Sequence, residues 1–344
     1  MTANDSPPAG ALVATAARFA SGARFGRVAI ILVNYRGWSD TIACLESLQA
    51  LAYRDFDVFV TENASPDDSF ERLCEWLRRQ AIFDSSVVGH EGEVLRRYPN
   101  NEACSRLYLT RTNKNLGFAG GNNISMSLAR RLYDYGFYWI LNNDTEVTAK
   151  SLGSLIDSAR SGSAIGMVGS TLRFFHDREN VQTYGGGRYN KWIARVQEIR
   201  NVGQGEEAGR LDYCTGASML VTREFIDKVG LMEEGYFLYC EELDWAIRGK
   251  EVGFALAHAP LSIVYHKEGA SIGTDSRDVA RRSEISDFYS IRSRILLTKR
   301  FFPSCLPTVY LSMLLVIFNR LRRKQYKRAR LVLRIIVNSR TSYE

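Results

Sequence analysis

"LYLTRTNKNLGFAGGNN", residues 107–123, joins two predicted elements of regular structure through a cluster of glycines. Apolar residues at its start predict a short strand, and the pattern over residues 122–135 predicts a helix. Gly117, Gly120 and Gly121 lie between the two. Such a turn is typical of a nucleotide-binding loop, but glycines at this place also serve simply to let a helix and a sheet approach closely. The neighbouring segments are needed to decide between these two interpretations.

Strands and helices alternate on both sides of this stretch. Apolar runs of strand length are followed by segments with helical spacing that begin with Ser, Asp or Pro. The predicted strands are 27–35, 55–65, 106–111 and 137–144, and the predicted helices are 39–51, 66–80 and 122–135. Residues 82–105 are predicted to form an irregular, polar insertion loop. This order predicts an α/β fold with a parallel sheet and helices on both of its faces.

The position of the glycines argues against a dinucleotide-binding fold. That fold requires G-x-G-x-x-G directly after the first strand, with an acidic residue about 20 residues later. The turn after the first strand contains only Gly37, and the cluster from Gly117 to Gly121 follows the third strand without a G-x-G. Polar residues at the ends of all four strands instead predict one nucleotide-sized cleft, since parallel strands end at the same edge of a sheet.

The strand ends and the segments that follow them are, in order, ILVNY, VTENAS, NKNLGFAGGNN, WILNNDTEV, the run from Tyr213 to Phe254, and VYHKEGAS. Taken together, these segments resemble glycosyltransferase family 2. The resemblance is to the bacterial rhamnosyltransferase-like branch, and it covers roughly residues 27–300. It implies a GT-A (Rossmann-like), mostly parallel sheet flanked by helices, and inverting transfer of a sugar from a nucleoside-diphosphate donor, with dTDP-rhamnose as the first expectation. UDP-galactofuranose, a UDP-hexose, and a catalytically silent nucleotide-sugar-binding protein stay open as alternatives.

The resemblance and the composition together predict how the chain is divided. Residues 1–25 are expected to be a disordered leader. Residues 27–275 are expected to be the GT-A catalytic domain, with a nucleotide-binding half (27–145) and an acceptor half (146–275). Residues 276–344 are expected to form a helical, basic C-terminal extension.

The family holds a divalent cation, Mg²⁺ or Mn²⁺, through a D-x-D-like motif after the fourth strand. Here the motif reads Asn142-Asn143-Asp144, so Asp144 is the one acid, and His266 stands where the family commonly brings a histidine to the metal. The resemblance therefore implies Asp144 and His266 as metal ligands; a turn capped by Asx side chains and a histidine packed at a strand end are the alternatives. The donor-binding residues that it implies are Val33, Asn34, Tyr35, Glu62, Asn63, Asn115, Gly117, Ala119, Asn122, Asn142 and Asn143.

The segment YFLYCEELDWAIRG places three carboxylates within four residues. Crowded like charges can raise a carboxyl pKa toward neutrality, which suits a general base. By motif position Glu242 is the expected base, with Glu241 as its rival, and Asp244 is expected to pair with Arg248 at i,i+4. The acceptor-binding residues implied by the resemblance are Thr215, Gly216, Ala217 and Asp244. Composition predicts a mobile loop near the acceptor at residues 183–192.

Positive charge is concentrated at the C-terminal end of the chain. The net charge is +7, and residues 299–344 hold 11 Lys and Arg against one acid, so the preceding residues carry −3. This distribution argues against a nucleic-acid-binding core. The apolar run Leu306–Phe318 is followed by seven cations, which predicts attachment to an anionic membrane surface. A core-packed helix with a solvated basic face is the alternative, RNA binding is a weaker third, and the run is predicted to be too short to span a membrane.

Six scattered cysteines without a C-x-x-C pair, together with an N-terminus that lacks a signal-peptide pattern, predict a cytoplasmic protein. The expected place of action is the inner face of the plasma membrane, where a nucleotide-sugar donor meets a glycan or lipid-linked glycan acceptor. A homo-oligomer is left open.

Overall fold

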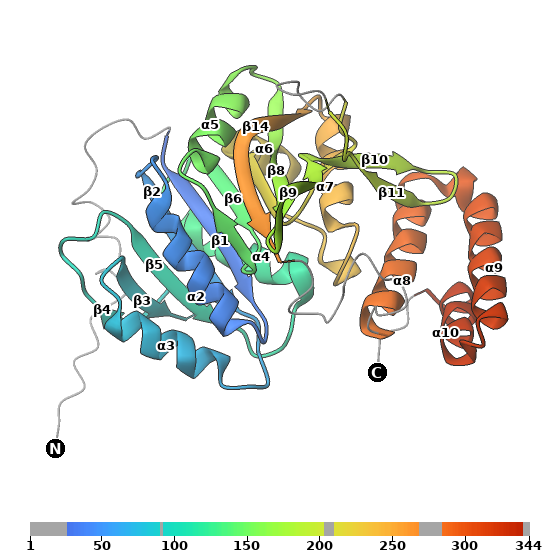
Figure 1. Ribbon diagram of the computed structural model, residues 1–344, viewed down its shortest axis with the longest axis horizontal. Helices are drawn as coiled ribbons and strands as arrows, with labels where there is room; N and C mark the ends of the chain where they lie inside the picture. Colours follow the sequence, from blue (N-terminus) through green and yellow to red (C-terminus); the bar gives the residue numbers. More distant parts are fainter. Residues whose placement is uncertain (1–25, 90–91, 203–209, 268–283, 340–344) are drawn as a thin grey trace.

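The computed structural model describes residues 26–89, 92–202, 210–267 and 284–339. The predicted leader and the serine that ends VYHKEGAS lie outside the described residues. Figure 1 shows a central sheet with helices on both faces and, at one side, an arm formed by the C-terminal helices. The α/β fold predicted from the alternation of strands and helices is confirmed, and the sheet has 11 strands.

The first half of the chain builds the parallel part of the sheet. Its strands lie in the order β5-β2-β1-β6, all parallel. They are β1 (Val28–Asn34), β2 (Phe56–Glu62), β5 (Arg106–Arg111) and β6 (Phe137–Leu141), and their helices are α2 (Trp38–Ser47), α3 (Ser69–Arg79) and α4 (Gly117–Leu132). Ile30 lies in one apolar cluster and its neighbour Ile31 in the other, because successive side chains of a strand point to opposite faces. Helices α2 and α3 cover the first face and α4 the second.

Two expectations for this half are wrong. Residues 82–105 are not an irregular loop, because β3 (Asp84–Val88) pairs parallel with β5 and β4 (Val94–Tyr98) pairs antiparallel with β3. These strands are short, and β4 is a largely exposed edge strand with two arginines, so they give little apolar signal. The third helix begins at Gly117 rather than at Asn122, which places the glycine cluster in its first turns.

The second half adds strands of mixed direction beside β6. β13 is antiparallel to β6 and β8, whereas β14 runs parallel to β8. These strands are β7 (Thr145–Val147), β8 (Ile165–Phe174), β9 (Asp177–Tyr184), β13 (Ser218–Thr222) and β14 (Ala255–His266). The helices are α5 (Ser151–Arg160), α6 (Arg223–Val229) and α7 (Glu241–Glu251), with short 3₁₀ turns at Leu48–Ala50, Glu234–Tyr236 and Pro303–Cys305.

A small second sheet connects the central sheet with the helical arm. It is formed by β10 (Gly186–Asn190), β11 (Arg195–Glu198) and β12 (Tyr213–Cys214), and β10 and β11 reach toward the arm (Figure 1). The mobile loop expected at residues 183–192 is therefore wrong, since most of this segment is paired strand. The glycines that suggested mobility are needed for close packing: a Cβ on Gly186 would lie 2.0 Å from the carbonyl oxygen of Tyr213.

The arm consists of α8 (Glu284–Phe301), α9 (Leu306–Arg322) and α10 (Tyr326–Val337). Helix α8 is bound to the turn before α7: Ser293 Oγ donates to the Leu238 carbonyl and Arg300 pairs with Glu233. By length and composition the segment Pro303–Arg322, with 20 residues, could cross a membrane, and an 18-residue window in it has a mean hydropathy of 1.4 and is 17% buried. The expectation that the apolar run is too short is thus wrong, because the 3₁₀ turn Pro303–Cys305 precedes α9 and α9 continues past Phe318 to Arg322.

Candidate functional site

Polar side chains at the ends of β1 and β2 hold the adjoining turns. The buried Asn34 accepts a hydrogen bond from Thr41 Oγ1 at 2.8 Å, and the buried Glu62 accepts one from the Ser65 amide at 2.8 Å. Asn143 donates to Thr41 Oγ1 at 2.9 Å and so joins the same network. These interactions shape the cleft edge, and the direct donor contacts of the three residues stay predictions.

Asn63 anchors the glycine-rich stretch to the sheet. Its amide nitrogen lies 3.1 Å from both Asn115 Oδ1 and the Gly117 carbonyl, and its oxygen accepts from the Leu116 amide at 2.9 Å. Asn115 in turn accepts from the Gly117 amide at 2.9 Å. Asn63 and Asn115, which were both predicted to lie at one cleft, therefore fix the turn to the end of β2.

The glycines in this stretch are explained by close packing. Gly117 has a φ of +72°, and a Cβ there would lie 2.2 Å from the Phe237 carbonyl oxygen. A Cβ on Gly121 would lie 2.8 Å from a methyl of Val33. Close approach of the helix to its surroundings, the second interpretation of these glycines, therefore accounts for both positions.

The remaining donor candidates differ in exposure. Val33 and Tyr35 are half-buried at the end of β1, and the Arg36 guanidinium lies 5.4 Å from the Tyr35 ring centre. Ala119 is fully buried, and Asn122 donates to the Phe118 carbonyl at 2.9 Å within α4. Contact of these residues with a nucleotide stays a prediction.

The two expected metal ligands lie together. Asp144 Oδ1 is 3.3 Å from His266 Nε2, and Asn142 Nδ2 is 3.4 Å from the same nitrogen. The pairing of β7 with β14 causes this, because His266 is the partner of Thr145 and the Lys267 amide donates to the Asp144 carbonyl. Both side chains are at least nine-tenths buried.

Gln182 fixes the orientation of the histidine ring. Its amide nitrogen donates to the His266 carbonyl at 3.0 Å, which leaves its oxygen 3.0 Å from His266 Nδ1. The proton therefore belongs on Nδ1, and the lone pair of Nε2 faces Asp144. Nε2 and Asp144 Oδ1 are two acceptors 3.3 Å apart, so there is a place for a proton or a metal ion between them, and the Asn142 amide nitrogen lies 3.4 Å from the same Nε2.

This donor set fits a divalent cation. One carboxylate oxygen and one imidazole nitrogen suit Mn²⁺ and are tolerable for Mg²⁺. No group of three or more His, Cys, Asp or Glu that could hold a metal occurs in the part of the chain that the structure describes. The other coordination positions would therefore fall to phosphate oxygens and water, as is usual for such cations at nucleotide sites. Gln182 was not predicted, because it lies in the mostly polar strand β9 and belongs to no motif.

The predicted acceptor segment runs from this pair to a second group of carboxylates. The Asn142 amide donates to the Ala217 carbonyl at 2.9 Å, and Thr215 Oγ1 lies 3.5 Å from Glu198 Oε2. A Cβ on Gly216 between them would lie 3.1 Å from the Phe118 ring. The segment thus adjoins both the expected metal ligands and Glu198, a carboxylate that was not predicted from the sequence.

A cavity of about 830 Å³ opens beside the start of α7. Its lining includes Glu242, Glu198 and Tyr213, together with residues of β10, β11 and α8. Tyr213 donates to Glu198 Oε1 at 2.8 Å. Burial and the charge of Glu198 raise the pKa of Glu242 to about 7, so this carboxyl can exchange a proton near neutral pH.

Glu241 does not line this cavity. It is fully buried, and neither carboxyl oxygen has a hydrogen-bond partner among the described residues. Burial, followed by the neighbouring Glu242 charge, holds the pKa of Glu241 well above its ordinary value, which favours its neutral form. Of the two rivals, Glu242 is the one with access to a substrate.

Strained backbone positions Glu242. Phe237, Tyr239 and Cys240 all have positive φ, at 70°, 68° and 74°, in the turn that leads into α7. Such conformations cost of order 1–3 kcal/mol each and persist only when the surroundings enforce them. The enforcing contacts include the Phe118 amide, which donates to the Phe237 carbonyl at 2.8 Å, and the bonds from α8 described above.

Asp244 lies behind the cavity rather than in its lining. It is fully buried and accepts hydrogen bonds from Tyr236 at 2.9 Å and from Arg248 at 2.6 Å. The expected i,i+4 pair with Arg248 is therefore confirmed, and Arg300 of α8 adds a third contact at 3.0 Å. Its expected contact with an acceptor stays a prediction.

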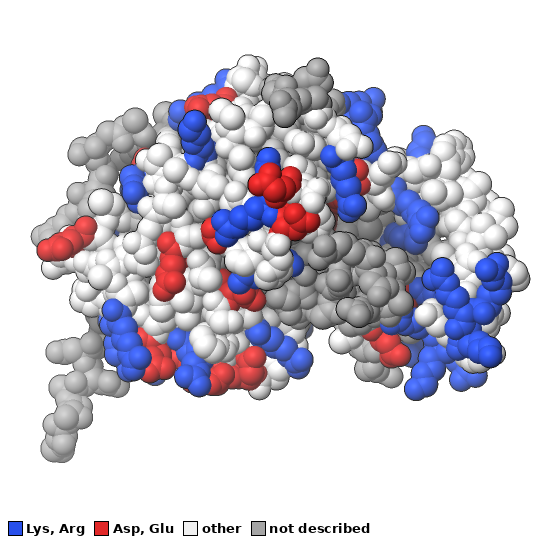
Figure 2. All heavy atoms as spheres, viewed as in Figure 1, with Lys and Arg blue, Asp and Glu red and all other residues white. Residues whose placement is uncertain are grey.

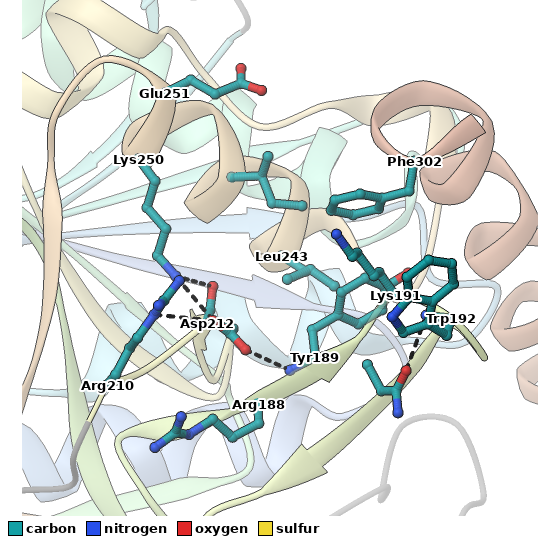
Figure 3. Close-up of a pocket in the computed structure, with 12 residues that line it drawn as sticks. Arg188, Tyr189, Lys191, Trp192, Arg210, Asp212, Leu243, Lys250, Glu251 and Phe302 are labelled. Carbon is teal, nitrogen blue, oxygen red and sulfur yellow. Dashed lines mark hydrogen bonds and ion pairs between the residues drawn. The ribbon is translucent and has the colours of Figure 1, made fainter. Parts of the chain in front are cut away.

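A second hollow of about 760 Å³ shares the lining residues Arg188, Tyr189, Asn190 and Leu243 with the Glu242 cavity (Figure 3). In it, Lys250 and Arg210 point toward Asp212, which accepts a hydrogen bond from the Tyr189 amide at 2.9 Å. These contacts join the small sheet to α7 and so hold the wall of the Glu242 cavity in place.

Comparisons with known proteins agree with this architecture. No family model matches the chain. It is 24% identical over 214 residues to N-acetylglucosaminyl-diphospho-decaprenol L-rhamnosyltransferase of two Mycobacterium tuberculosis strains (CDC 1551 / Oshkosh and H37Rv). The match covers 56% of this chain and 67% of each relative.

Two solved structures show the same fold at low identity. A mannosyltransferase from Pyrobaculum calidifontis in complex with GDP-Man and Mn²⁺ is 13% identical, with a TM-score of 0.52 over 95% of this chain and 93% of that one. GalNAc-T7 with UDP, GalNAc and Mn²⁺ is 15% identical, with a TM-score of 0.54 over 79% of this chain, which spans only 48% of that protein. The chain therefore has the GT-A fold, and its sequence resembles the rhamnosyltransferase-like branch of glycosyltransferase family 2.

Proposed function

We propose that the chain is a metal-dependent, inverting glycosyltransferase that moves a sugar, rhamnose from dTDP-rhamnose in the first instance, onto a glycan acceptor. One observation carries the proposal: the 215–217 segment adjoins the Asp144–His266 pair at one end and the cavity of Glu198 and Glu242 at the other. A donor and an acceptor bound at these two places would meet across that segment.

On the donor side, Asp144 and His266 would hold Mg²⁺ or Mn²⁺, which neutralises charge on the departing nucleoside diphosphate when it is bound. Gln182 keeps the Nε2 lone pair of His266 directed at the ion. Asn63 and Asn115 hold the glycine-rich turn that forms the wall of the donor cleft.

On the acceptor side, Glu242 takes the proton from the attacking hydroxyl. The acceptor oxygen forms a bond to the anomeric carbon while the bond to the diphosphate oxygen breaks, and the electron pair leaves with the nucleotide. Inversion follows from this in-line displacement. A pKa near 7 suits the task, because Glu242 is partly ionised at neutral pH and still basic enough to accept the proton.

The acceptor class is proposed from the curated relatives, whose name specifies N-acetylglucosaminyl-diphospho-decaprenol. A lipid-linked acceptor would bring the protein to the inner face of the plasma membrane. Consistent with this, one stripe of α9 is exposed: Leu311, Leu314, Leu315 and Phe318 are each 53–61% accessible. Only Val309 and Met313 of α9 are buried, so core packing accounts for a small part of the apolar run.

A silent nucleotide-sugar-binding protein is the second candidate. It is favoured by the asparagine at position 142 and by Glu62, whose carboxylate is occupied by the Ser65 amide.

A panel of dTDP-, UDP- and GDP-sugars separates the candidates. Each donor is titrated by calorimetry with and without Mn²⁺, and transfer to an N-acetylglucosaminyl-diphospholipid is then measured. Transfer from dTDP-rhamnose supports the proposal, and transfer from a UDP-sugar alone replaces its donor. Binding without transfer to any acceptor supports the silent protein.

A further inference from the structure

A smaller pocket of about 330 Å³ lies between β11 and the helices of the arm. Five arginines and one carboxylate are among its lining residues, and we call it the arginine pocket. These residues are Arg195, Arg294, Arg320, Arg323, Arg328 and Asp287. The proposed transfer reaction assigns no role to this pocket.

The positive charge in this pocket is only partly neutralised. Asp287 pairs with Arg320 at 2.6 Å. Arg294 donates to the Ala194 carbonyl at 2.6 Å, which is an uncharged acceptor. Among the described residues, Arg195, Arg294 and Arg323 make no ion pair. An anion is therefore the ligand that this pocket would accept, and the planar guanidinium group matches phosphate oxygens in pairs.

The arginines also disfavour one another in the absence of an anion. Burial, followed by the nearby charge of Arg195, lowers the pKa of Arg294 to about 10, and Arg320 acts in the same direction. A bound phosphate would relieve both the repulsion and the loss of hydration.

The arginine pocket adjoins the cavity of Glu242. Arg195, Ser290 and Arg294 line both hollows, so the two are continuous along α8. On its other side, Val316 and Arg320 of α9 form its wall. The outer face of the same helix carries the exposed apolar stripe, so pocket and stripe are about one helix diameter apart, ~10 Å.

The surface of the arm has a basic part and an uncharged part. In Figure 2 the Lys and Arg residues gather over the end of α9 and over α10, while the surface along the rest of α9 is uncharged. From Glu242 outward, the cavity with the base comes first, the arginine pocket second, and the exposed apolar stripe of α9 third. A lipid-linked sugar has its sugar, its phosphates and its lipid in the same order.

We propose that the arginine pocket binds the phosphate groups of a lipid-diphosphate-linked acceptor while the acceptor sugar lies in the cavity beside Glu242. The inference rests on the proposed function, since it specifies how that reaction would hold its acceptor. It assigns Arg195, Arg294 and Arg323 to acceptor binding, a role that no sequence motif suggested.

The test compares two soluble acceptors in the absence of lipid. One is N-acetylglucosamine linked through a diphosphate to a short alkyl chain, and the other has an uncharged linker in place of the diphosphate. The variant is Arg195→Gln with Arg323→Gln, because both side chains are exposed and their loss should not disturb the fold. Arg54→Gln with Arg78→Gln, two exposed arginines of the nucleotide-binding half, removes the same charge elsewhere.

For the diphosphate acceptor, we expect the pocket variant to raise KM by about tenfold or more while kcat changes less, since it loses two guanidinium groups whose hydrogen bonds to phosphate are charge-assisted. KM for the uncharged acceptor and both constants of the control variant should stay at wild-type values. Equal KM changes for the two acceptors, or for the two variants, would overturn the proposal. So would a variant that binds anionic vesicles less well but keeps its KM, since the pocket would then be a lipid-headgroup site.

A binding measurement separates this proposal from the proposed function. The diphosphate compound is titrated into the wild-type protein and the pocket variant by calorimetry, without donor. Binding that the variant loses supports the pocket even if no sugar is ever transferred. Transfer by the wild-type protein with no loss of binding in the variant overturns the pocket and leaves the transferase standing.

Discussion

Asp144 Oδ1 lies 3.3 Å from His266 Nε2 because the last residues of β14 pair with the first residues of β7. The two residues come from opposite ends of the second half of the fold. Their approach is therefore set by backbone pairing, and the direction of the imidazole is set separately, by Gln182.

The first prediction concerns that orientation. Gln182→Leu should weaken the apparent affinity for Mn²⁺ in the presence of donor by roughly 10- to 100-fold, because the ring loses the partner that fixes its tautomer. Asp144→Asn, which removes a ligand, should weaken it further. Calorimetric titration of Mn²⁺ in the presence of each donor measures both. Wild-type affinity in Gln182→Leu would mean that the ring is held in place without it.

That Asp144 and His266 lie close together, as do Asn63 and Asn115, could be predicted from the sequence, because their positions depend on strand ends. Asn63, Asn115 and Asp144 follow buried strands, and the ends of parallel strands necessarily meet at one edge. Gln182 and Glu198 could not be predicted in the same way. Gln182 lies in the mostly polar strand β9, and Glu198 in the four-residue strand β11. Their partners, His266 of β14 and Tyr213 of β12, are distant in the sequence and come close only in the folded chain.

For the fold as well, apolar segments were predicted and polar ones were missed. The four parallel strands β1, β2, β5 and β6 were predicted from their apolar runs, whereas β3 and β4 were missed because each is short and more than half of its residues are polar or charged. The glycines near Gly117 correctly indicated an unusual backbone, but not that the Phe237 carbonyl was the group approaching it. Composition can identify where a Cβ is excluded without identifying what excludes it.

The second prediction concerns the base. Glu242→Gln should lower kcat by several orders of magnitude while donor affinity stays near the wild-type value, because a base acts only in the transition state. Glu241→Gln should keep most of the activity, since its carboxyl is buried and does not line the cavity. Single-turnover rates together with donor titrations decide this. The reverse pattern would make Glu241 the base.

The third prediction is a pH dependence. As a base, Glu242 must be ionised, so kcat/KM at saturating metal should rise with pH through about 7 and then level off. Glu198 contributes a negative charge that raises the pKa of Glu242, so Glu198→Gln should move this rise to lower pH. Glu251→Gln removes an exposed carboxylate from the other end of α7 and should leave the profile unchanged. If the pH profile of Glu198→Gln is unshifted, the charge of Glu198 does not raise the pKa of Glu242.

The fourth prediction concerns stability. Glu241 has a pKa well above its ordinary value of 4.5 in the folded chain, so the folded state holds a proton that the unfolded state releases. The free energy of unfolding should therefore fall as pH rises above about 4.5, up to the folded pKa. Glu241→Gln removes this penalty, and its Tm should fall less between pH 5 and pH 8 than that of the wild type. Parallel Tm profiles for the two proteins would show that Glu241 is ionised in the fold.

The last prediction concerns the membrane. Leu315 and Phe318 are 60% and 59% exposed, so replacing both by Ser should leave the fold intact while removing apolar surface that a bilayer would bury. Wild-type protein should bind liposomes that contain anionic lipid, and binding should weaken as salt screens the basic arm. The double variant should bind markedly less at every salt concentration. Val252→Ser with Leu261→Ser, equally exposed at 53% and 63% but outside the arm, serves as the control. If both double variants bind like the wild type, the basic residues attach the protein without the apolar stripe. If the wild type binds neutral liposomes as well as anionic ones, the basic arm has no part in the attachment.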